Sequence, residues 1–273
     1  MGLLKNKKIS FIGAGNMAEA LVGGLLKKGT VASDHIILSD PSMNRLEHFK
    51  SKFKVLTSAS NTSCVSKGDI IILAVKPQVM ANVLKDLKGK IKERHLVISI
   101  AAGITTSFIK NQIGDNIKII RVMPNTPALV GKGISAISGN SSISDEDMSL
   151  AEEAMKSVGK TVILDEHFLD AVTGLSGSGP AYVFLIIEAL IEGGVASGLP
   201  RNIARELVLE TILGSITLLG ETGKHPGELK EMVTSPGGTT VAGLKVLEAK
   251  GVRSALIEAV EAAAKRSKEL SGK

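Results

Sequence analysis

The chain has 273 residues, 44% of them hydrophobic and 22% charged, which is typical of a globular protein long enough for two domains. Its 33 basic and 27 acidic side chains are scattered, and with no Trp and one Tyr the chain lacks the basic clusters and stacking rings of nucleic-acid-binding proteins. A single cysteine excludes an internal disulfide, and the first eight residues contain no apolar core of signal-peptide length, so we expect a cytoplasmic protein.

The first predicted strand, residues 9–12, leads into a glycine-rich turn, and a predicted helix over 19–28 follows. The turn reads Gly13-Ala14-Gly15-Asn16-Met17-Ala18. A strand, Gly-x-Gly-x-x-Ala and a helix together form a dinucleotide-binding fingerprint, in which the first glycine permits a tight turn and the second admits a pyrophosphate. We therefore expect a dinucleotide cofactor to contact Gly13, Gly15, Asn16 and Met17 at the N-terminus of this helix.

The second predicted strand, residues 35–39, ends at Asp40. A carboxylate at this position hydrogen-bonds the adenosine ribose of NAD and repels the 2′-phosphate of NADP. Arg45 could instead pair with that phosphate. Asp40 would also serve as the N-cap of a predicted helix over 43–49. The cofactor is thus NADPH or NADH, with NADH slightly favoured.

Strands and helices alternate through the rest of the first half. Further strands are predicted at 53–56, 69–75, 95–100, 116–122, 133–138 and 161–164, and helices at 61–67, 78–87, 106–112 and 145–158. This alternation predicts an α/β fold, with a Rossmann-type doubly wound parallel sheet over residues 1–165. Ligands bind beyond the carboxyl ends of such strands, so four turns should converge on one cleft: Gly13 to Met17, Ala74 to Gln78, Ala101 to Gly103, and Met123 to Thr126.

The second half is predicted to be an all-α domain over residues 166–273. Helices are expected at 165–173, 180–197, 200–220, 226–233, 239–250 and 252–270. The longest apolar run, 181–196, contains two glutamates and falls short of the ~20 residues of a membrane span, so it predicts a buried helix and no membrane partner. Apolar residues on several sides of these helices favour a helix-exchanging homodimer over a self-contained bundle.

A glycine-rich stretch, Thr173 to Pro180, opens the longest apolar helix, and we expect it to lie beside a ligand at the hinge between the domains. The alternative is that its glycines only allow tight turns and close helix packing. The stretch resembles the Gly-x-x-Gly-x-Gly-x-x-x-Lys pattern of the β-hydroxyacid dehydrogenases, but Val183 stands at the lysine position. Reduction of a carbonyl normally needs such a proton donor. Because the five histidines show no metal-ligand spacing either, no metal is expected, and the pattern favours an imine as the substrate.

A second loop, residues 232–240, packs hydroxyls and glycines against the start of a predicted helix. Exposed N–H groups and hydroxyls at a helix N-terminus form a site for a carboxylate. Serine and threonine also favour helix N-caps, so an elaborate cap is the alternative.

Over nearly its whole length the sequence resembles the 1-pyrroline-5-carboxylate reductase family. The resemblance lies in Phe11-Ile-Gly-Ala-Gly-Asn-Met17, Ala74-Val-Lys-Pro77, Ala101-Ala-Gly103, Pro124-Asn-Thr-Pro127, Leu175-Ser-Gly-Ser-Gly-Pro-Ala-Tyr-Val-Phe184, and His225-Pro-Gly-Glu-Leu with Ser235-Pro-Gly-Gly-Thr-Thr240. It implies reduction of 1-pyrroline-5-carboxylate to L-proline with NADPH or NADH, the last step of proline biosynthesis. It also implies a homodimer formed through the C-terminal helices, often assembled into a decamer.

The resemblance also implies roles for single residues. The cofactor site would be lined by Asn61, Ala74, Val75, Lys76, Pro77, Ala101, Ala102 and Gly103. The substrate carboxylate would be held by Ser235, Gly237, Gly238 and Thr239, and the catalytic residue Thr240 would hydrogen-bond the ring nitrogen. Family members differ at the positions of Asp40 and Gly223, and the first leaves the cofactor preference open.

Two rival functions are a reductase of another imine or a hydroxy acid, and a non-catalytic NAD-sensing protein. Val183 argues against the hydroxy acid, and the intact loop from Ser235 to Thr240 argues against the non-catalytic protein.

Overall fold

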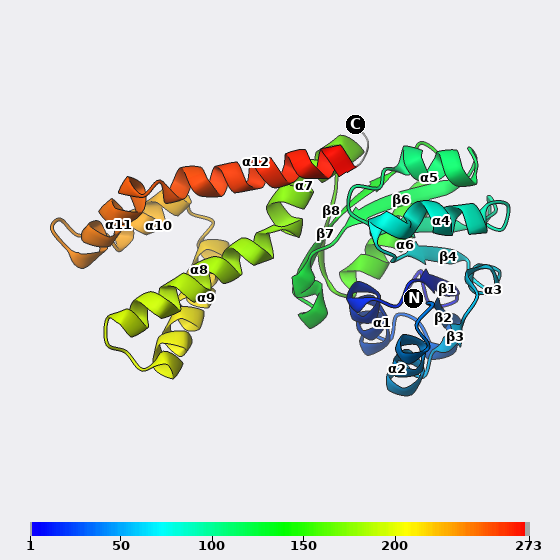
Figure 1. Ribbon diagram of the computed structural model, residues 1–273, viewed down its shortest axis with the longest axis horizontal. Coiled ribbons are helices and arrows are strands. Elements are labelled where there is room, and N and C mark those ends of the chain that lie inside the picture. The colour runs from blue at the N-terminus through cyan, green and yellow to red at the C-terminus, as the bar shows by residue number, and fades with distance from the viewer. Residues whose placement is uncertain (1, 271–273) are drawn as a thin grey trace. The chain divides into compact units, whose positions relative to one another are not determined.

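The computed structural model describes residues 2–270 and divides into two compact units. The first unit consists of Met1–Ser178 together with Ala262–Lys273, and the second is Gly179–Glu261 (Figure 1). The predicted domain boundary at 165/166 stays a prediction.

An eight-stranded sheet forms the centre of the first unit, with the strand order β3-β2-β1-β4-β5-β6-β7-β8. The strands are β1 Ile9–Ile12, β2 Ile36–Ser39, β3 Leu56–Ser58, β4 Ile70–Leu73, β5 Leu96–Ser99, β6 Lys118–Met123, β7 Gly133–Gly139 and β8 Gly159–Ile163. Neighbouring strands are parallel except for β6 and β7, whose short connection through Thr126–Val130 leaves no room for a crossover helix. The predicted α/β, Rossmann-type sheet is confirmed, with this antiparallel pair added.

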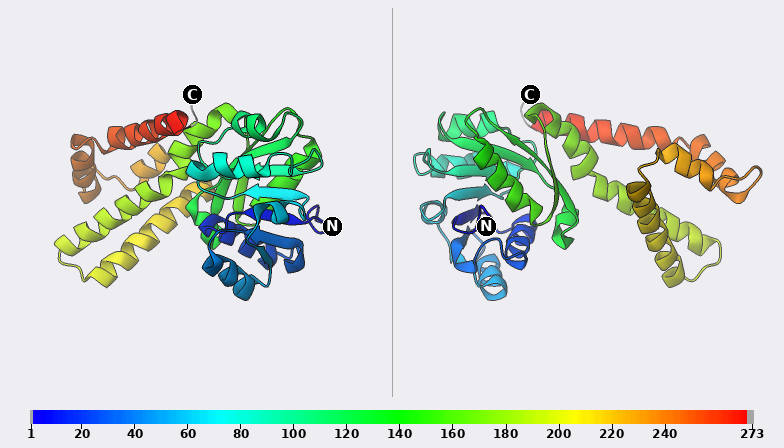
Figure 2. Two further views of the ribbon diagram at one scale, coloured as in Figure 1. Left: turned by 45° about the vertical axis from the view of Figure 1, so that its right-hand side comes forward. Right: turned by 180° about the vertical axis from the view of Figure 1, so that it is seen from behind.

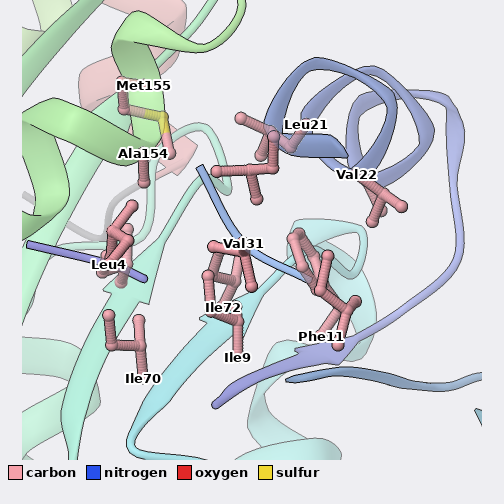
Figure 3. Packing of buried hydrophobic residues seen from close by; sticks show 14 of the residues in the cluster. Leu4, Ile9, Phe11, Leu21, Val22, Val31, Ile70, Ile72, Ala154 and Met155 are labelled. Atoms are coloured by element: carbon pink, nitrogen blue, oxygen red, sulfur yellow. The ribbon is translucent and has the colours of Figure 1, made fainter. Parts of the chain in front are cut away.

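Helices cover both faces of the sheet. They are α1 Asn16–Lys27, α2 Met43–Phe53, α3 Asn61–Val65, α4 Pro77–Leu87, α5 Thr106–Ile113 and α6 Asp145–Lys156. On β4, Ile70 and Ile72 pack towards α1, α2 and α6, whereas Ile71 and Leu73 pack towards α3, α4 and α5. This two-residue alternation buries the strand on both sides, as its continuous apolar sequence predicts. Figure 3 shows the first of these clusters, with side chains of α1 and α6 over those of β1 and β4.

The strand predicted at 53–56 is misplaced. Phe53 is the last residue of α2, where it packs on Phe49 with ring centroids 5.6 Å apart. Lys54 then adopts a left-handed conformation (φ 57°) that ends the helix, and β3 begins only at Leu56. The side chain of Phe53 thus belongs to the apolar face of the helix, since it follows Phe49 at a four-residue spacing.

The helix predicted at 165–173 is a series of different helical turns. A 3₁₀ turn at Glu166–Phe168 leads into α7, Leu169–Val172, and a π-helical turn follows at Thr173–Gly177. The N–H of Ser178 donates to the carbonyl of Thr173 at 2.9 Å, which is the five-residue step of a π-helix. This irregular turn precedes Pro180, which cannot continue a regular α-helical ladder, and it lies where the first unit ends.

The second unit is helical, as predicted. Its helices are α8 Gly179–Ala196, α9 Arg201–Thr222, α10 Pro226–Met232, α11 Thr239–Ala249 and most of α12 Val252–Leu270 (Figure 2). Helices α8 and α9 pack on each other. The turn that joins them contains Gly198, whose φ of 96° favours glycine.

The expectation that α8 is buried on most faces is wrong for the single chain. Not one residue of α8 is buried, and Phe184 and Leu185 are 63% and 66% exposed. Within residues 2–270, the stretch 166–196 is long and apolar enough to cross a membrane, which by itself is weak support for a span. Uncovered apolar helix faces are equally typical of a surface that another protein chain covers.

Candidate cofactor and substrate site

The carboxyl ends of β1, β2, β4, β5 and β6 share one edge of the sheet, here called the cofactor edge. Gly13 follows β1 directly, and its N–H donates to the carbonyl of Ser39 at the end of β2 (2.7 Å). A Cβ at Gly13 would lie 2.8 Å from the carbonyl oxygen of Ala74, and its φ is +103°. Only glycine therefore fits where the turn after β1 passes the backbone of Ala74, the residue after β4.

The N-terminus of α1 is open where a phosphate group would approach. Gly15 is the N-cap of α1, and a Cβ built on it would meet nothing within 4 Å. Beside it lies a hollow of about 250 Å³, lined by Gly13, Ser39, Pro41, Ala59, Asn61, Val75, Val79 and Val83. The free N–H groups of a helix N-terminus together with this space fit a dinucleotide pyrophosphate.

Asp40 is bonded through both of its carboxylate oxygens. Oδ2 accepts the N–H of Ala14 at 2.8 Å, and Oδ1 accepts the N–H of Ser42 at 2.8 Å. The N-cap of α2 is Ser42, whose side chain accepts the N–H of Arg45. Asp40 is therefore not the helix cap, because its carboxylate joins the glycine-rich turn to the loop after β2.

Arg45 is held by the same turn. Its Nε donates to the carbonyl of Ala14 at 2.7 Å, and its guanidinium pairs with Glu19 at 2.8 Å. His48 and Lys52 also contact the carboxylate of Glu19. Burial would raise the pKa of Glu19, but hydrogen bonds from Lys52, His48 and Arg45 outweigh it and lower the pKa to about 2. In this structure Arg45 is thus bonded to Ala14 and Glu19, groups that a 2′-phosphate would have to compete with.

The remaining predicted cofactor residues follow β3, β4 and β5. Asn61 lies next to the end of β2, where its Oδ1 accepts the Ser39 hydroxyl at 2.7 Å. Lys76 is the N-cap of α4, and Pro77 is the first residue of that helix. Gly103 has a φ of +73°, and a Cβ there would lie 3.3 Å from Cβ of Leu270, so the end of α12 packs against the turn after β5. These residues belong to the turns at the cofactor edge, as the strand order predicts.

The structure joins the loop after β6 to the glycine-rich stretch at 173–180. The side chain of Asn125 donates from Nδ2 to the hydroxyl of Ser176 at 3.3 Å. A Cβ at Gly177 would collide with the side chain of Met123. The stretch thus contacts the loop after β6, and its place beside a ligand stays a prediction. Sequence reasoning did not single out Ser176, although it lies inside the glycine pattern.

The predicted substrate loop lies in the second unit. Gly238 is the N-cap of α11, and no side chain caps this helix. Gly237 has a φ of +71°, and a Cβ at Gly238 would collide with the hydroxyl of Ser235. Since no side chain caps α11, a role as an elaborate cap is not observed, and the N-terminal N–H groups of α11 stay open to a ligand. Residues 2–270 contain no cluster of three metal-binding side chains.

Comparisons with known proteins cover both units. The family model described as pyrroline-5-carboxylate reductase dimerisation matches residues 166–270, and that of NADP oxidoreductase, coenzyme F420-dependent, matches residues 8–103. Pyrroline-5-carboxylate reductase from Synechocystis is 47% identical over 97% of this chain and 99% of its own. The enzyme of that name from Arabidopsis thaliana is 46% identical over 97% of this chain and 95% of its own.

Solved structures agree. Pyrroline-5-carboxylate reductase from Coxiella burnetii superposes with a TM-score of 0.89 at 38% identity, covering 98% of this chain and 99% of that one. The Plasmodium falciparum pyrroline carboxylate reductase with NADP bound superposes with a TM-score of 0.91 at 34% identity, with the same coverage.

Proposed function

Because the chain belongs to the pyrroline-5-carboxylate reductase family, we propose that it reduces 1-pyrroline-5-carboxylate to L-proline with NADPH or NADH. It is an oxidoreductase of the last step of proline biosynthesis. The observation that carries this conclusion is the 47% identity to a reductase of this name over 97% of the chain, which includes both the cofactor edge and the loop Ser235 to Thr240.

The cofactor is proposed to lie along the cofactor edge, and when bound it supplies the hydride. The N-terminus of α1 and the turn at Gly13 and Gly15 would bind the pyrophosphate. Asp40 would face the adenosine ribose, and the turns from Ala74 to Pro77 and from Ala101 to Gly103 would line the rest. This assignment is supported by the open space at Gly15 and the hollow beside Asn61.

The substrate carboxylate is proposed to bind at the N-terminus of α11, to the N–H groups and hydroxyls of Ser235, Gly237, Gly238 and Thr239. An uncapped helix N-terminus with adjacent hydroxyls favours an anion. Thr240 would hydrogen-bond the ring nitrogen and so orient the C=N bond.

The proton requirement of the reaction explains why no strong acid is needed. An imine nitrogen takes a proton from solvent far more readily than a ketone oxygen does. Hydride then adds to the carbon of the iminium, and the nitrogen keeps its proton, so the product is a secondary amine. Thr240 therefore holds the N–H without having to supply it, which agrees with Val183 at the position where hydroxyacid enzymes carry lysine.

The protein oligomerises through its C-terminal region, as the matched dimerisation family indicates. We propose a homodimer in which the apolar faces of α8 and α9 are covered by a second copy, with assembly into a decamer as a further step. Phe184 and Leu213, 63% and 59% exposed in the single chain, belong to these faces. In this proposal a second protein chain, and not lipid, covers the apolar helix faces, and the protein is cytoplasmic. The single cysteine, Cys64, is buried and free, which fits a reducing compartment.

The test is oxidation of NADH and of NADPH, measured in parallel by absorbance with 1-pyrroline-5-carboxylate as the substrate. We expect turnover with at least one cofactor and none with a 2-hydroxy acid and the oxidised cofactor. Absence of turnover with both cofactors in a folded, cofactor-binding protein would favour the NAD-sensing alternative.

A further inference from the structure

The amide of Asn125 has a defined orientation. Its Oδ1 accepts the N–H of Ile134 at 3.0 Å, at the start of β7. A backbone N–H can only donate, so the side-chain atom that faces it must be the oxygen. The NH₂ group is therefore the one that faces Ser176, and it donates to the hydroxyl oxygen at 3.3 Å.

This orientation determines what the Ser176 hydroxyl does. Because its oxygen accepts a hydrogen from Asn125, its own hydrogen points elsewhere. Among residues 2–270, no acceptor for that hydrogen is observed. Ser176 is partly exposed, so the structure contains a hydroxyl that is oriented as an outward donor by a fixed amide.

The hydroxyl lies at the cofactor edge. Asn125 follows β6, two strands beyond β4, whereas Asp40 follows β2 on the other side of β1. In a doubly wound sheet the dinucleotide extends across the carboxyl ends of the strands, with its adenosine half over the strand that carries the acidic residue. The β6 side of the edge therefore corresponds to the nicotinamide half, where the hydride is transferred.

We propose that Ser176 is a ligand-binding residue of the reductase, donating its hydroxyl hydrogen to a ligand oxygen beside the nicotinamide. The acceptor is the carboxamide oxygen of the cofactor or a carboxylate oxygen of the substrate, which share this chemistry. Asn125 acts as a positioning residue, because it holds the hydroxyl in the donating orientation. This inference rests on the proposed function and adds a residue to it.

Three variants separate donation from a structural role. Ser176→Ala removes the hydroxyl, and Ser176→Thr keeps it. Asn125→Asp leaves an acceptor for the Ile134 N–H but places a carboxylate oxygen against Ser176, so the hydroxyl turns inward to donate to it. Ser149→Ala is the matched control, because the Ser149 hydroxyl donates its hydrogen to the carbonyl of Asp145 on the exposed face of α6.

Binding is measured by calorimetry with NADP⁺ and with adenosine 2′,5′-bisphosphate, which lacks the nicotinamide, and with L-proline in the presence of NADPH. Loss of one neutral hydrogen bond should weaken the affected ligand about two- to tenfold. We expect Ser176→Ala and Asn125→Asp to weaken the binding of either NADP⁺ or L-proline to this extent. Ser176→Thr should bind both ligands with nearly wild-type affinity. The adenosine fragment should bind equally to all variants.

The Asn125→Asp result is diagnostic for NADP⁺. The oxidised nicotinamide ring is positively charged, so an added carboxylate alone would tighten binding, and weaker binding requires the reversed hydrogen bond. Weaker binding of NADP⁺ assigns the cofactor carboxamide as the acceptor. Weaker binding of L-proline, with unchanged affinity for NADP⁺, assigns the substrate carboxylate. Unchanged affinity for both, or equal weakening of the adenosine fragment, overturns the inference. A wild-type protein that binds neither NADP⁺ nor NAD⁺ would instead overturn the proposed function.

Discussion

The carboxylate of Asp40 accepts the backbone N–H of Ala14 at 2.8 Å, so the end of β2 is bonded directly to the glycine-rich turn after β1. The same aspartate thus shapes the pyrophosphate turn and carries the negative charge next to the expected ribose. Arg45 donates to the carbonyl of that same Ala14 at 2.7 Å. The two side chains that we propose to influence cofactor choice, Asp40 and Arg45, are therefore coupled through one residue of the turn.

Replacing Asp40 with Ser should shift cofactor preference towards NADPH. The serine removes repulsion of the 2′-phosphate while keeping a hydroxyl acceptor for the turn. We expect the ratio of kcat/KM for NADPH to that for NADH to rise about tenfold, which corresponds to about 1.4 kcal/mol. Asp34→Ser, an exposed aspartate in the turn before β2, is the matched control. An unchanged ratio would mean that Arg45 or the backbone decides the preference.

Replacing Gly15 with Val should abolish cofactor binding and leave the fold intact. A Cβ at this position meets nothing within 4 Å, so the valine side chain is expected to extend into the space proposed for the pyrophosphate. Gly24→Ala is the opposite case, because its Cβ would lie 2.7 Å from the carbonyl of Ser157. We expect the first variant to keep its Tm and lose NADH binding, and the second to lose stability. A folded Gly15→Val protein with wild-type affinity for NADH would contradict the phosphate site.

The turn at Gly13 and Gly15 could be predicted from the sequence because it is local: a strand, a turn and a helix follow one another in the chain. The bond between Asn125 and Ser176 could not be predicted, since 51 residues separate the two side chains and a π-helical turn brings them together. The prediction of where β3 begins was wrong for a related reason. The left-handed Lys54 sets where α2 ends, and no propensity pattern marks it.

The C-terminal helices show a different limit. Their positions follow from glycine and proline breaks, and the predicted ranges agree closely with the structure. Their burial does not follow, because apolar residues such as Phe184 and Leu185 stay exposed in the single chain. Sequence hydrophobicity predicts that a surface is buried. It does not say whether the same chain or a second copy buries it.

Glu19→Gln should destabilise the first unit near neutral pH but not at low pH. The pKa of Glu19 is lowered on folding from 4.5 to about 2. A carboxylate of this kind stabilises the fold above its unfolded pKa and loses that contribution as pH falls from 4.5 towards 2. We expect a loss of about 1–2 kcal/mol in the free energy of unfolding at neutral pH, at the lower end for hydrogen bonds to charged groups because the cationic partners are partly exposed.

Urea unfolding of the wild type and Glu19→Gln across this pH range measures the effect. The difference between the two proteins should shrink steadily as the solution is acidified. A difference that stays constant down to the lowest pH would show that Arg45, His48 and Lys52 do not stabilise the ionised carboxylate.

Thr240→Ala should retain measurable turnover. Loss of one neutral hydrogen bond to the ring nitrogen costs about 0.5–1.5 kcal/mol, and about 1.4 kcal/mol is tenfold in rate. Thr240→Val should be similar or slower, because a methyl group replaces the hydroxyl and crowds the ring. Steady-state kinetics on both variants decide the point. A fall of more than about a thousandfold, or ~4 kcal/mol, would show that Thr240 is the proton donor.

We propose that this chain moves a hydride from its nicotinamide cofactor to the C=N carbon of 1-pyrroline-5-carboxylate. Mass spectrometry of the product formed with cofactor deuterated at the hydride-donating position tests it most directly. We expect L-proline that carries the deuterium on the carbon that formed the C=N bond, with one cofactor oxidised for each proline made. Proline without the label, or cofactor oxidation without proline, would contradict it.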